Sequence, residues 1–184
     1  MPAARRSLSD LTPHLLLLAG LSAASAALGA DAQREPPSEP VEAESQCVDG
    51  IVGTWVGLER RPTGMLNYTL TIQRINPYSP ALIGTIESHF WSGTANQPPT
   101  SCGPDDVGYV MHQPAAGTFL APRVEFSASR IDRVEKRCGE PPTYWPDGFT
   151  GQVTADGSAF RTISDDGHTD AQSVTLRRVS CLED

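Results

Sequence analysis

The alternation of apolar and polar side chains is the feature that most constrains the fold of this chain. In LNYTLTIQRI (66–75), every second residue from Leu66 to Ile72 is apolar and the residues between them are polar. Such period-two alternation is typical of a β-strand with one buried face. No stretch of useful length carries an apolar stripe with the 3.6-residue period of a helix. The sequence therefore predicts an all-β fold.

Turn signals divide the alternating pattern into eight strands. The strongest is Asp156-Gly157, a hairpin signal in the middle of FTGQVTADGSAFRTIS (149–164). With no crossover helix between strands, we expect an antiparallel up-and-down meander, which closes into a barrel or folds into a sandwich. We predict an eight-stranded barrel, because closure removes the exposed edges of a long meander. The predicted strands are 53–58, 66–75, 82–91, 108–113, 123–131, two within 149–164, and 173–179.

Successive connections of a meander alternate between the two ends of the barrel. The long connections 92–106 and 132–148 therefore lie at one end, which we predict to be the mouth. RIDRVEKR (130–137), which overlaps the start of the second connection, interleaves basic and acidic residues, so we expect a solvated loop there. The mouth should also contain 59–65 and 165–172, and the closed end should contain 76–81, 114–122 and 155–158.

The same alternation of ends sorts the four cysteines. None forms a Cys-x-x-Cys pair, and an even number at wide spacing indicates two disulfides in an exported protein rather than a zinc site. Cys102 and Cys138 fall in mouth loops, whereas Cys47 and Cys181 flank the first and last strands at the closed end. Because a disulfide joins Cα atoms only ~4.4–6.8 Å apart, this topology predicts the pairs Cys47–Cys181 and Cys102–Cys138.

The amino-terminal part of the chain has the pattern of an export signal. Arg5 and Arg6 precede LLLLAGLSAASAALGA (15–30), an apolar run rich in small residues. That run is short for a membrane span, so residues 1–30 are interpreted as a signal peptide rather than an uncleaved anchor. The acidic, proline-rich residues 31–46 predict a disordered linker. We expect a secreted or periplasmic protein, without stable membrane insertion after cleavage, whose folded domain is 47–184.

The charge balance argues against a nucleic-acid partner. From Cys47 onwards the chain has 16 acidic and 11 basic side chains. Phosphate backbones are bound by surfaces with a net positive charge. We therefore expect no nucleic-acid binding.

A short motif on the first predicted strand resembles the Gly-x-Trp signature of the calycins, the superfamily of lipocalins, fatty-acid-binding proteins and avidins. It consists of Gly53, Thr54 and Trp55. The resemblance implies an eight-stranded barrel in which Trp55 plugs the closed end and packs against an arginine of the last strand. Arg178 shares a face with the apolar residues of that strand and matches better than Arg177. The Thr-Asp-Tyr motif and carboxy-terminal helix of typical lipocalins are missing, so the chain is calycin-like.

Aromatic and thioether side chains converge on the predicted mouth. Groups of this kind around a concave site are typical of pockets for small molecules. The alternative is that they cap the core beneath a long loop. Phe90 and Trp91 are neighbours at the end of the third strand, so strand alternation allows at most one of them to point inward. The candidate ligand-binding residues are Phe90, Trp91, Tyr109, Met111, Tyr144 and Trp145.

The most polar segment, SDDGHTD (164–170), is interpreted as a turn. Gly167 supplies a positive φ, and aspartates hydrogen-bond the neighbouring backbone in turns. A calcium loop needs alternating ligands and a distal glutamate, which are missing, so we expect no metal site. His89, His112 and His168 lack a catalytic motif around them, and Glu87 and Glu125 fall on outward faces. We therefore assign no catalytic residue and no cofactor.

Three functions are consistent with these features. The leading hypothesis is a barrel that binds a small, largely apolar molecule at its mouth. The second is a protein-interaction module such as a protease inhibitor, which would use exposed loops. The third is a barrel enzyme, a cyclase or a hydrolase, which would need a buried polar cluster with shifted pKa values.

Overall fold

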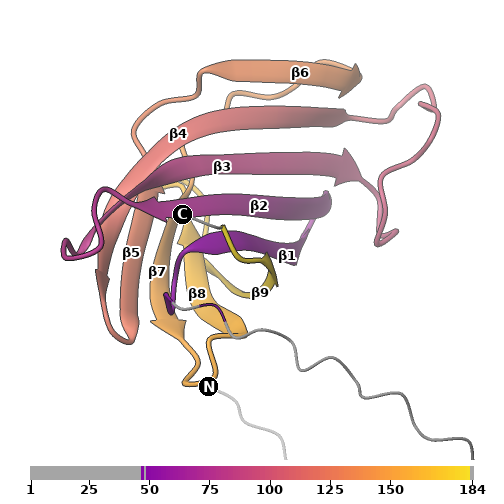
Figure 1. The fold of residues 1–184 in the computed structure, drawn as a ribbon. Helices are drawn as coiled ribbons and strands as arrows, with labels where there is room; N and C mark the ends of the chain where they lie inside the picture. Colours follow the sequence, from indigo (N-terminus) through magenta and orange to yellow (C-terminus); the bar gives the residue numbers. More distant parts are fainter. Residues whose placement is uncertain (1–46, 48, 183–184) are drawn as a thin grey trace, which may run out of the picture. The chain divides into compact units, whose positions relative to one another are not determined.

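The computed structural model describes Cys47 and residues 49–182, and it contains nine strands in this range. The predicted signal peptide and linker lie outside the described residues. No helix in the described part of the chain is long and apolar enough to span a membrane. The strands, labelled in Figure 1, are β1 (Gly53–Arg61), β2 (Gly64–Arg74), β3 (Ala81–Ser92), β4 (Gly108–Leu120), β5 (Arg123–Ala128), β6 (Arg133–Cys138), β7 (Gly148–Val153), β8 (Ala159–Asp165) and β9 (Gln172–Ser180).

Eight of these strands close into an antiparallel barrel, as predicted. Hydrogen bonds join β1, β2, β3, β4, β5, β7, β8 and β9 in this order, and β9 returns to β1. All pairings are antiparallel. The hairpin at Asp156-Gly157 is confirmed, with Gly157 at φ 69°. The predicted all-β, eight-stranded barrel is therefore the observed fold.

The ninth strand, β6, corrects the prediction of a loop at 130–137. β5 is short. On β4 it reaches only Ala115–Leu120, which leaves the first half of β4 without a partner on that side. β6 occupies this edge and pairs with Gly108–His112. Figure 1 shows it beside β4, outside the eight strands that close. The alternating charges of this segment gave no apolar periodicity, because neither face of β6 packs into the barrel core.

β4 also runs further than predicted, through Pro114. Proline lacks the N–H group that a ladder needs and is therefore restricted to strand edges and irregular positions. Pro114 lies between Gly108–His112, which pair with β6, and Ala115–Leu120, which pair with β5. At that point β4 changes its partner on one edge, so an N–H group is not required there.

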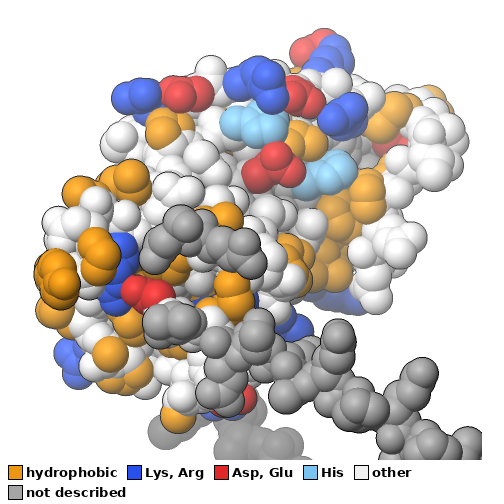
Figure 2. Space-filling model, viewed as in Figure 1, with side chains coloured by type: hydrophobic (Ala, Val, Ile, Leu, Met, Phe, Trp, Pro, Cys, Tyr) orange, Lys and Arg blue, Asp and Glu red, His pale blue; other side chains and the backbone are white. Residues whose placement is uncertain are grey.

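Basic and acidic side chains gather over β6, at the top of the view in Figure 2. The imidazole of His112 lies 3.3 Å from Glu87 Oε2 and 3.2 Å from Glu135 Oε1. Arg133 and Arg137 lie 2.6 and 3.0 Å from the Glu135 carboxylate. These opposite charges offset one another. Charged side chains on an exposed edge strand also discourage pairing with other chains.

The barrel core consists of inward residues of the eight strands that close, with the alternation that the sequence predicts. Their side chains are at most 8% exposed and pack as one cluster. Burying a large apolar side chain stabilises a fold by about 1.5–3 kcal/mol, so this cluster is the main source of stability. It includes Trp55, Leu66, Tyr68, Leu70, Ile72, Ile86, Val124, Phe126, Phe160, Val174 and Leu176.

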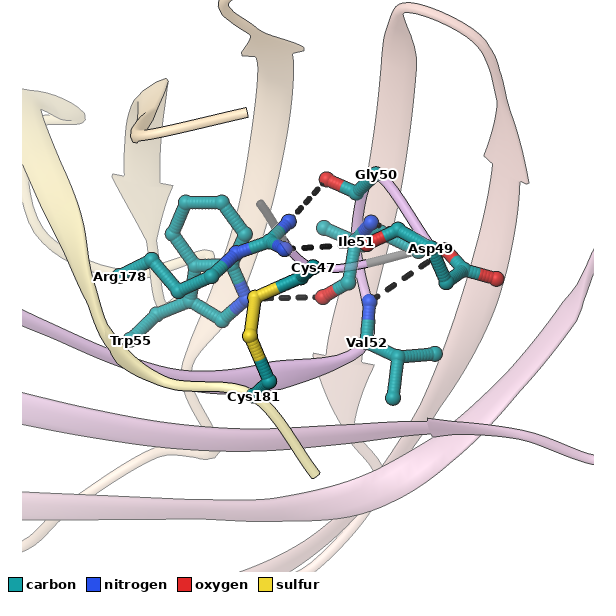
Figure 3. The surroundings of a disulfide bond; sticks show 8 residues. All are labelled: Cys47, Asp49, Gly50, Ile51, Val52, Trp55, Arg178 and Cys181. Carbon is teal, nitrogen blue, oxygen red and sulfur yellow. Dashed lines mark hydrogen bonds between the residues drawn. A yellow bond between two sulfur atoms is a disulfide. The ribbon is translucent and has the colours of Figure 1, made fainter. Parts of the chain in front are cut away.

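At the closed end, the calycin-like pair is formed as expected. The Arg178 guanidinium lies 4.5 Å from the centre of the Trp55 ring, and Phe160 packs edge-on at 6.2 Å. Trp55 Nε1 donates to the Ile51 carbonyl at 2.8 Å, and Arg178 donates to the carbonyls of Asp49 and Gly50 (Figure 3). Gly53 is needed because a Cβ there would overlap the carbonyl oxygen of Ser180 on β9.

Both predicted disulfides are present. Cys47 pairs with Cys181 and Cys102 with Cys138, each with Cα atoms 5.6 Å apart. The first pair lies beside Trp55 and Arg178 (Figure 3), and the second joins the 93–107 loop to the end of β6. Two disulfides in a domain of this size are typical of an oxidising compartment, either extracellular or periplasmic.

Candidate functional site

A pocket of about 630 Å³ opens at the mouth of the barrel. The β1–β2 turn, the 139–147 segment and the 166–171 loop form its walls. All three belong to the end that the alternation of connections identified as the mouth. The lining residues are Arg61, Pro62, Thr63, Leu66, Phe90, Pro142, Thr143, Tyr144, Trp145, Asp147, Asp166, His168, Thr169, Asp170 and Gln172.

Three of the six candidate ligand-binding residues line this pocket, namely Phe90, Tyr144 and Trp145. Tyr109 is fully buried behind them, stacked on Phe90 at 5.1 Å and against Tyr144 at 4.5 Å. Its hydroxyl is buried without a hydrogen-bond partner among the described residues. Met111 is likewise a fully buried core residue. Tyr109 therefore supports the pocket wall from behind, whereas Met111 belongs to the barrel core.

Trp91 is placed elsewhere, as the alternation along β3 requires. Phe90 belongs to the barrel core, whereas Trp91 is buried outside that cluster. The indole Nε1 of Trp91 donates to the Ala95 carbonyl at 2.8 Å, and its ring contacts His89 at 5.4 Å. Trp91 therefore packs beneath the 93–107 loop and does not line the mouth pocket.

The rim of the pocket carries a stacked pair of rings. Trp145, from the 139–147 segment, lies parallel to the imidazole of His168 with ring centres 3.7 Å apart. Trp145 is nevertheless 45% exposed. This contact joins two loops across the mouth and leaves part of a large aromatic surface open to solvent.

The SDDGHTD segment is a turn, and it also forms one wall of the pocket. Asp165 accepts a hydrogen bond from the Gly167 amide at 2.7 Å. Asp166 accepts from the amides of His168 and Thr169 at 2.9 and 2.7 Å. Burial acts to raise the pKa of Asp166, but these hydrogen bonds and the nearby Arg61 outweigh it and lower the pKa. Asp166 is thus an ionised group at the mouth.

A buried polar cluster around Glu59 lies inside the barrel beneath the mouth. Glu59 is only 4% exposed, and its carboxylate accepts hydrogen bonds from Ser164 at 2.6 Å and Tyr68 at 3.1 Å. It also forms an ion pair with Arg61, which in turn donates to Thr169 at 2.9 Å. Burial and the charges of Asp147 and Glu59 raise the pKa of Tyr68, so its phenol stays protonated and donates.

Sequence reasoning missed Glu59 because it ended the first strand at residue 58. The strand continues to Arg61. Extension of the Trp55 face by two steps leads to Gly57 and then to Glu59, which identifies an inward carboxylate. The signal was therefore present in the alternation. Glu59 was instead assigned to the predicted connection 59–65.

A second buried cluster surrounds Asp147, the last residue before β7. Asp147 is 5% exposed. Its Oδ2 accepts hydrogen bonds from Ser88 on β3 at 2.6 Å and Gln113 on β4 at 2.5 Å, and its amide donates to Gln113 Oε1 at 2.9 Å. Burial raises the pKa of Asp147 above its ordinary value, although the hydrogen bonds from Ser88 and Gln113 act in the opposite direction.

Asp147 could not be identified from the sequence. It belongs to PPTYWPDG, a segment without periodicity, and nothing local indicates that this segment folds inward against β3 and β4. Ser88 and Gln113 do lie on inward faces of their strands. Two buried polar residues on adjacent inward faces need a partner, and this is the only signal that could have predicted an inward group from a loop.

Among the described residues, no group of three or more histidine, cysteine, aspartate and glutamate side chains is arranged to hold a metal ion. Comparisons with protein-family models, curated proteins and solved structures found no match to this chain. The closed eight-stranded barrel with its Trp55–Arg178 pair is consistent with a calycin-like fold.

Proposed function

We propose that this protein is an exported calycin-like binding protein that holds a small, largely apolar molecule in the mouth pocket. The observation that carries the proposal is the composition of the pocket wall. Leu66, Phe90, Tyr144 and Trp145 line one continuous pocket of about 630 Å³. Pockets for small ligands occupy roughly 300–1,000 Å³ and combine an apolar lining with a few polar groups.

The exposure of Trp145 supports the same proposal. Its ring is held by His168 yet 45% exposed, so a bound apolar molecule would remove that surface from water. Burial of apolar surface contributes roughly 25 cal/mol per Å². Trp145 is therefore the residue on which we expect ligand binding to depend most.

Titration with an apolar fluorescent dye tests this proposal. We expect binding at one site with quenching of tryptophan emission, and Trp145→Ala should weaken it about thirtyfold, the ~2 kcal/mol typical of an aromatic anchor. Tyr78→Ala is the matched control, because Tyr78 is 98% exposed at the closed end. If the dye does not bind, or if both variants bind it like the wild type, the proposal is wrong.

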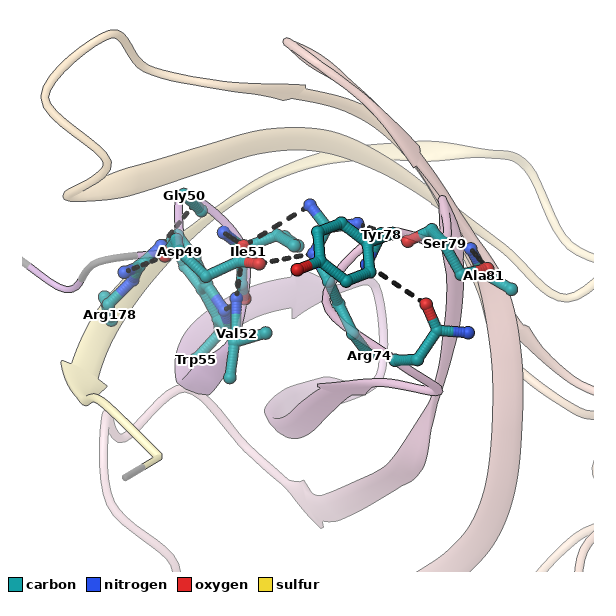
Figure 4. A network of polar contacts seen from close by, with 11 residues as sticks. Asp49, Gly50, Ile51, Val52, Trp55, Arg74, Tyr78, Ser79, Ala81 and Arg178 are labelled. Atoms are coloured by element: carbon teal, nitrogen blue, oxygen red, sulfur yellow. Dashed lines mark hydrogen bonds and ion pairs between the residues drawn. The ribbon is translucent and has the colours of Figure 1, made fainter. Parts of the chain in front are cut away.

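A protein-interaction module, for example a protease inhibitor, is the second candidate, favoured by the loop that carries Tyr78. Arg74 is ion-paired with Asp49 and donates to the Ser79 carbonyl at 2.7 Å (Figure 4). The Tyr78 amide donates to the Asn76 side chain at 3.0 Å. This network holds an exposed aromatic ring on an ordered loop, as an inhibitory loop requires.

A panel of secreted proteases separates this candidate from ligand binding. The protein-interaction function predicts inhibition of at least one protease, lost in Tyr78→Ala and retained in Trp145→Ala. The opposite pattern, with inhibition unaffected by Tyr78→Ala, would exclude the Tyr78 loop as the inhibitory element.

A further inference from the structure

The position of Asp147 indicates which chemical group a ligand in the mouth pocket carries. Asp147 lines the pocket, although its side chain is almost completely buried. Ser88 and Gln113 both donate to Oδ2, and neither of them lines the pocket. No described residue donates a hydrogen bond to Oδ1. Oδ1 is therefore the oxygen of this carboxylate that remains available to a molecule in the pocket.

Oδ1 of Asp147 has no hydrogen-bond donor among the described residues and is not a fully enclosed atom, so a molecule in the pocket can reach it. Carboxylate oxygens on nearly buried side chains usually have hydrogen-bond donors, so an oxygen without a protein donor favours a ligand that supplies one. Ser88 and Gln113 fix the carboxylate in one orientation. A bound molecule with an N–H or O–H group at this depth would complete its set of partners.

The charges around the pocket favour a cation over a neutral donor. Asp147, Asp166 and Asp170 line it, against the single guanidinium of Arg61. Arg61 is already ion-paired with buried Glu59, so its charge is offset. The remaining basic residue of the lining, His168, is stacked on Trp145. The lining therefore has a net negative charge.

The aromatic residues of the same pocket suit an organic cation. Tyr144 and Trp145 also line the pocket, and they precede Asp147 by three and two residues in the sequence. Aromatic faces attract ammonium groups, and their rings also pack against an apolar body. A site that combines a buried carboxylate with aromatic walls holds both parts of an amphipathic amine.

We propose that the mouth pocket recognises organic amines, with the ammonium group bound to Asp147 and the apolar body against Tyr144 and Trp145. This inference rests on the proposed ligand-binding function and defines the class of ligand. Asp147 acts as the specificity-determining residue, and Ser88 and Gln113 orient it.

Three probes with the same ring test the inference on the wild-type protein. Naphthylmethylamine, naphthylmethanol and naphthoate differ in charge but share their apolar body. By calorimetry at neutral pH, we expect the amine to bind about tenfold more tightly than the alcohol, and naphthoate to bind more weakly than both, because a close ion pair in a partly desolvated site discriminates by charge. This ranking does not depend on the folding of any variant.

Asp147→Asn then assigns the preference to one side chain. This isosteric change should reduce the affinity for naphthylmethylamine about tenfold and leave that for naphthylmethanol within about twofold. Asp105→Asn is the matched control, since it removes the same charge from an exposed residue that does not line the pocket. Asp105→Asn should retain the preference for the amine.

The outcomes separate the two levels of the proposal. If the amine and the alcohol bind equally well, or if folded Asp147→Asn keeps the preference, the amine inference is wrong while the ligand-binding function stands. If none of the three probes binds to the wild-type protein, both the binding function and the amine inference are wrong.

Discussion

The two ends of the barrel each contain a tryptophan stacked on a nitrogen-containing group, but they use it differently. At the closed end, Trp55 is fully buried beneath Arg178. At the mouth, Trp145 stacks on His168 and remains 45% exposed. The first contact completes a core, and the second leaves aromatic surface available. The same type of contact therefore serves stability at one end and, we propose, binding at the other.

The polar groups at the two ends also differ in their role. At the closed end, Arg178 donates to backbone carbonyls and covers apolar side chains. Beneath the mouth, Glu59 and Asp147 are carboxylates buried inside the barrel, where apolar residues would stabilise the fold more. Buried carboxylates cost stability unless they are fully partnered. Among the described residues, buried carboxylates occur at the mouth end and not at the closed end, which indicates that the mouth is not optimised for stability alone.

The largest expected difference between the ends concerns the two tryptophans. Trp55→Ala should lower the free energy of unfolding by about 3–5 kcal/mol, because it removes a fully buried aromatic ring. Trp145→Ala should change it by less than about 1 kcal/mol, because the ring is half exposed. Urea denaturation of both variants measures this comparison. Equal losses would show that Trp145 is a core residue.

The disulfides allow the second comparison. Replacement of Cys47 and Cys181 by serine should cost about 2–5 kcal/mol, and replacement of Cys102 and Cys138 about 1 kcal/mol less. The reason is that the sequence separations are 134 and 36 residues, and a longer loop restricts the unfolded chain more. Thermal unfolding of the two double variants gives the order. A larger loss from the mouth disulfide would contradict the chain-entropy account.

The third prediction concerns the neighbouring arginines of β9. Arg178→Ala should cost about 1–3 kcal/mol, since it removes the contact with Trp55 and two hydrogen bonds to backbone carbonyls. Arg177 is exposed, so Arg177→Ala should stay within about 0.5 kcal/mol. Chemical denaturation compares them. The reverse order would require β9 to be shifted by one residue.

The smallest expected effect is a pH dependence at the mouth. Because burial raises the folded-state pKa of Asp147, the native state binds more protons than the unfolded state between the two pKa values, and stability falls as pH rises through that range. Asp147→Asn should thus be as stable as the wild type or slightly more stable, by up to ~1 kcal/mol, at neutral pH. The gain should vanish as pH falls toward the ordinary aspartate pKa of 3.8.

Unfolding curves of both proteins across this range provide the measurement. Arg61, Asp166 and the neighbouring tyrosines are present in both, so the difference between the curves isolates Asp147. The variant could instead be less stable than the wild type by the same amount at neutral and at low pH. That result would show that the amide introduced by Asp147→Asn cannot accept the hydrogen bonds from Ser88 and Gln113.

Much of the candidate site could not be predicted from short stretches of the sequence. Phe90, Tyr144 and Trp145 could be predicted, because a position near a strand end or in a long mouth loop was sufficient to place them. Tyr109 lies behind the wall, Met111 lies in the barrel core, and Trp91 lies outside that core. Their assignment required the exact direction of each strand at the mouth. Asp147, central to the further inference, was not predicted at all.

The sequence by itself determined the all-β class, the inward face of strands with clear alternation such as 66–75, and the pairing of the cysteines. These features follow from the period-two pleat and the alternation of connections, which are properties of the chain's order. The tertiary structure alone decided that β6 fills the free edge of β4 and that the 139–147 segment brings Asp147 to Ser88 and Gln113. Irregular segments have no periodicity, so their placement depends on which unpaired edges and buried polar groups the rest of the barrel leaves for them.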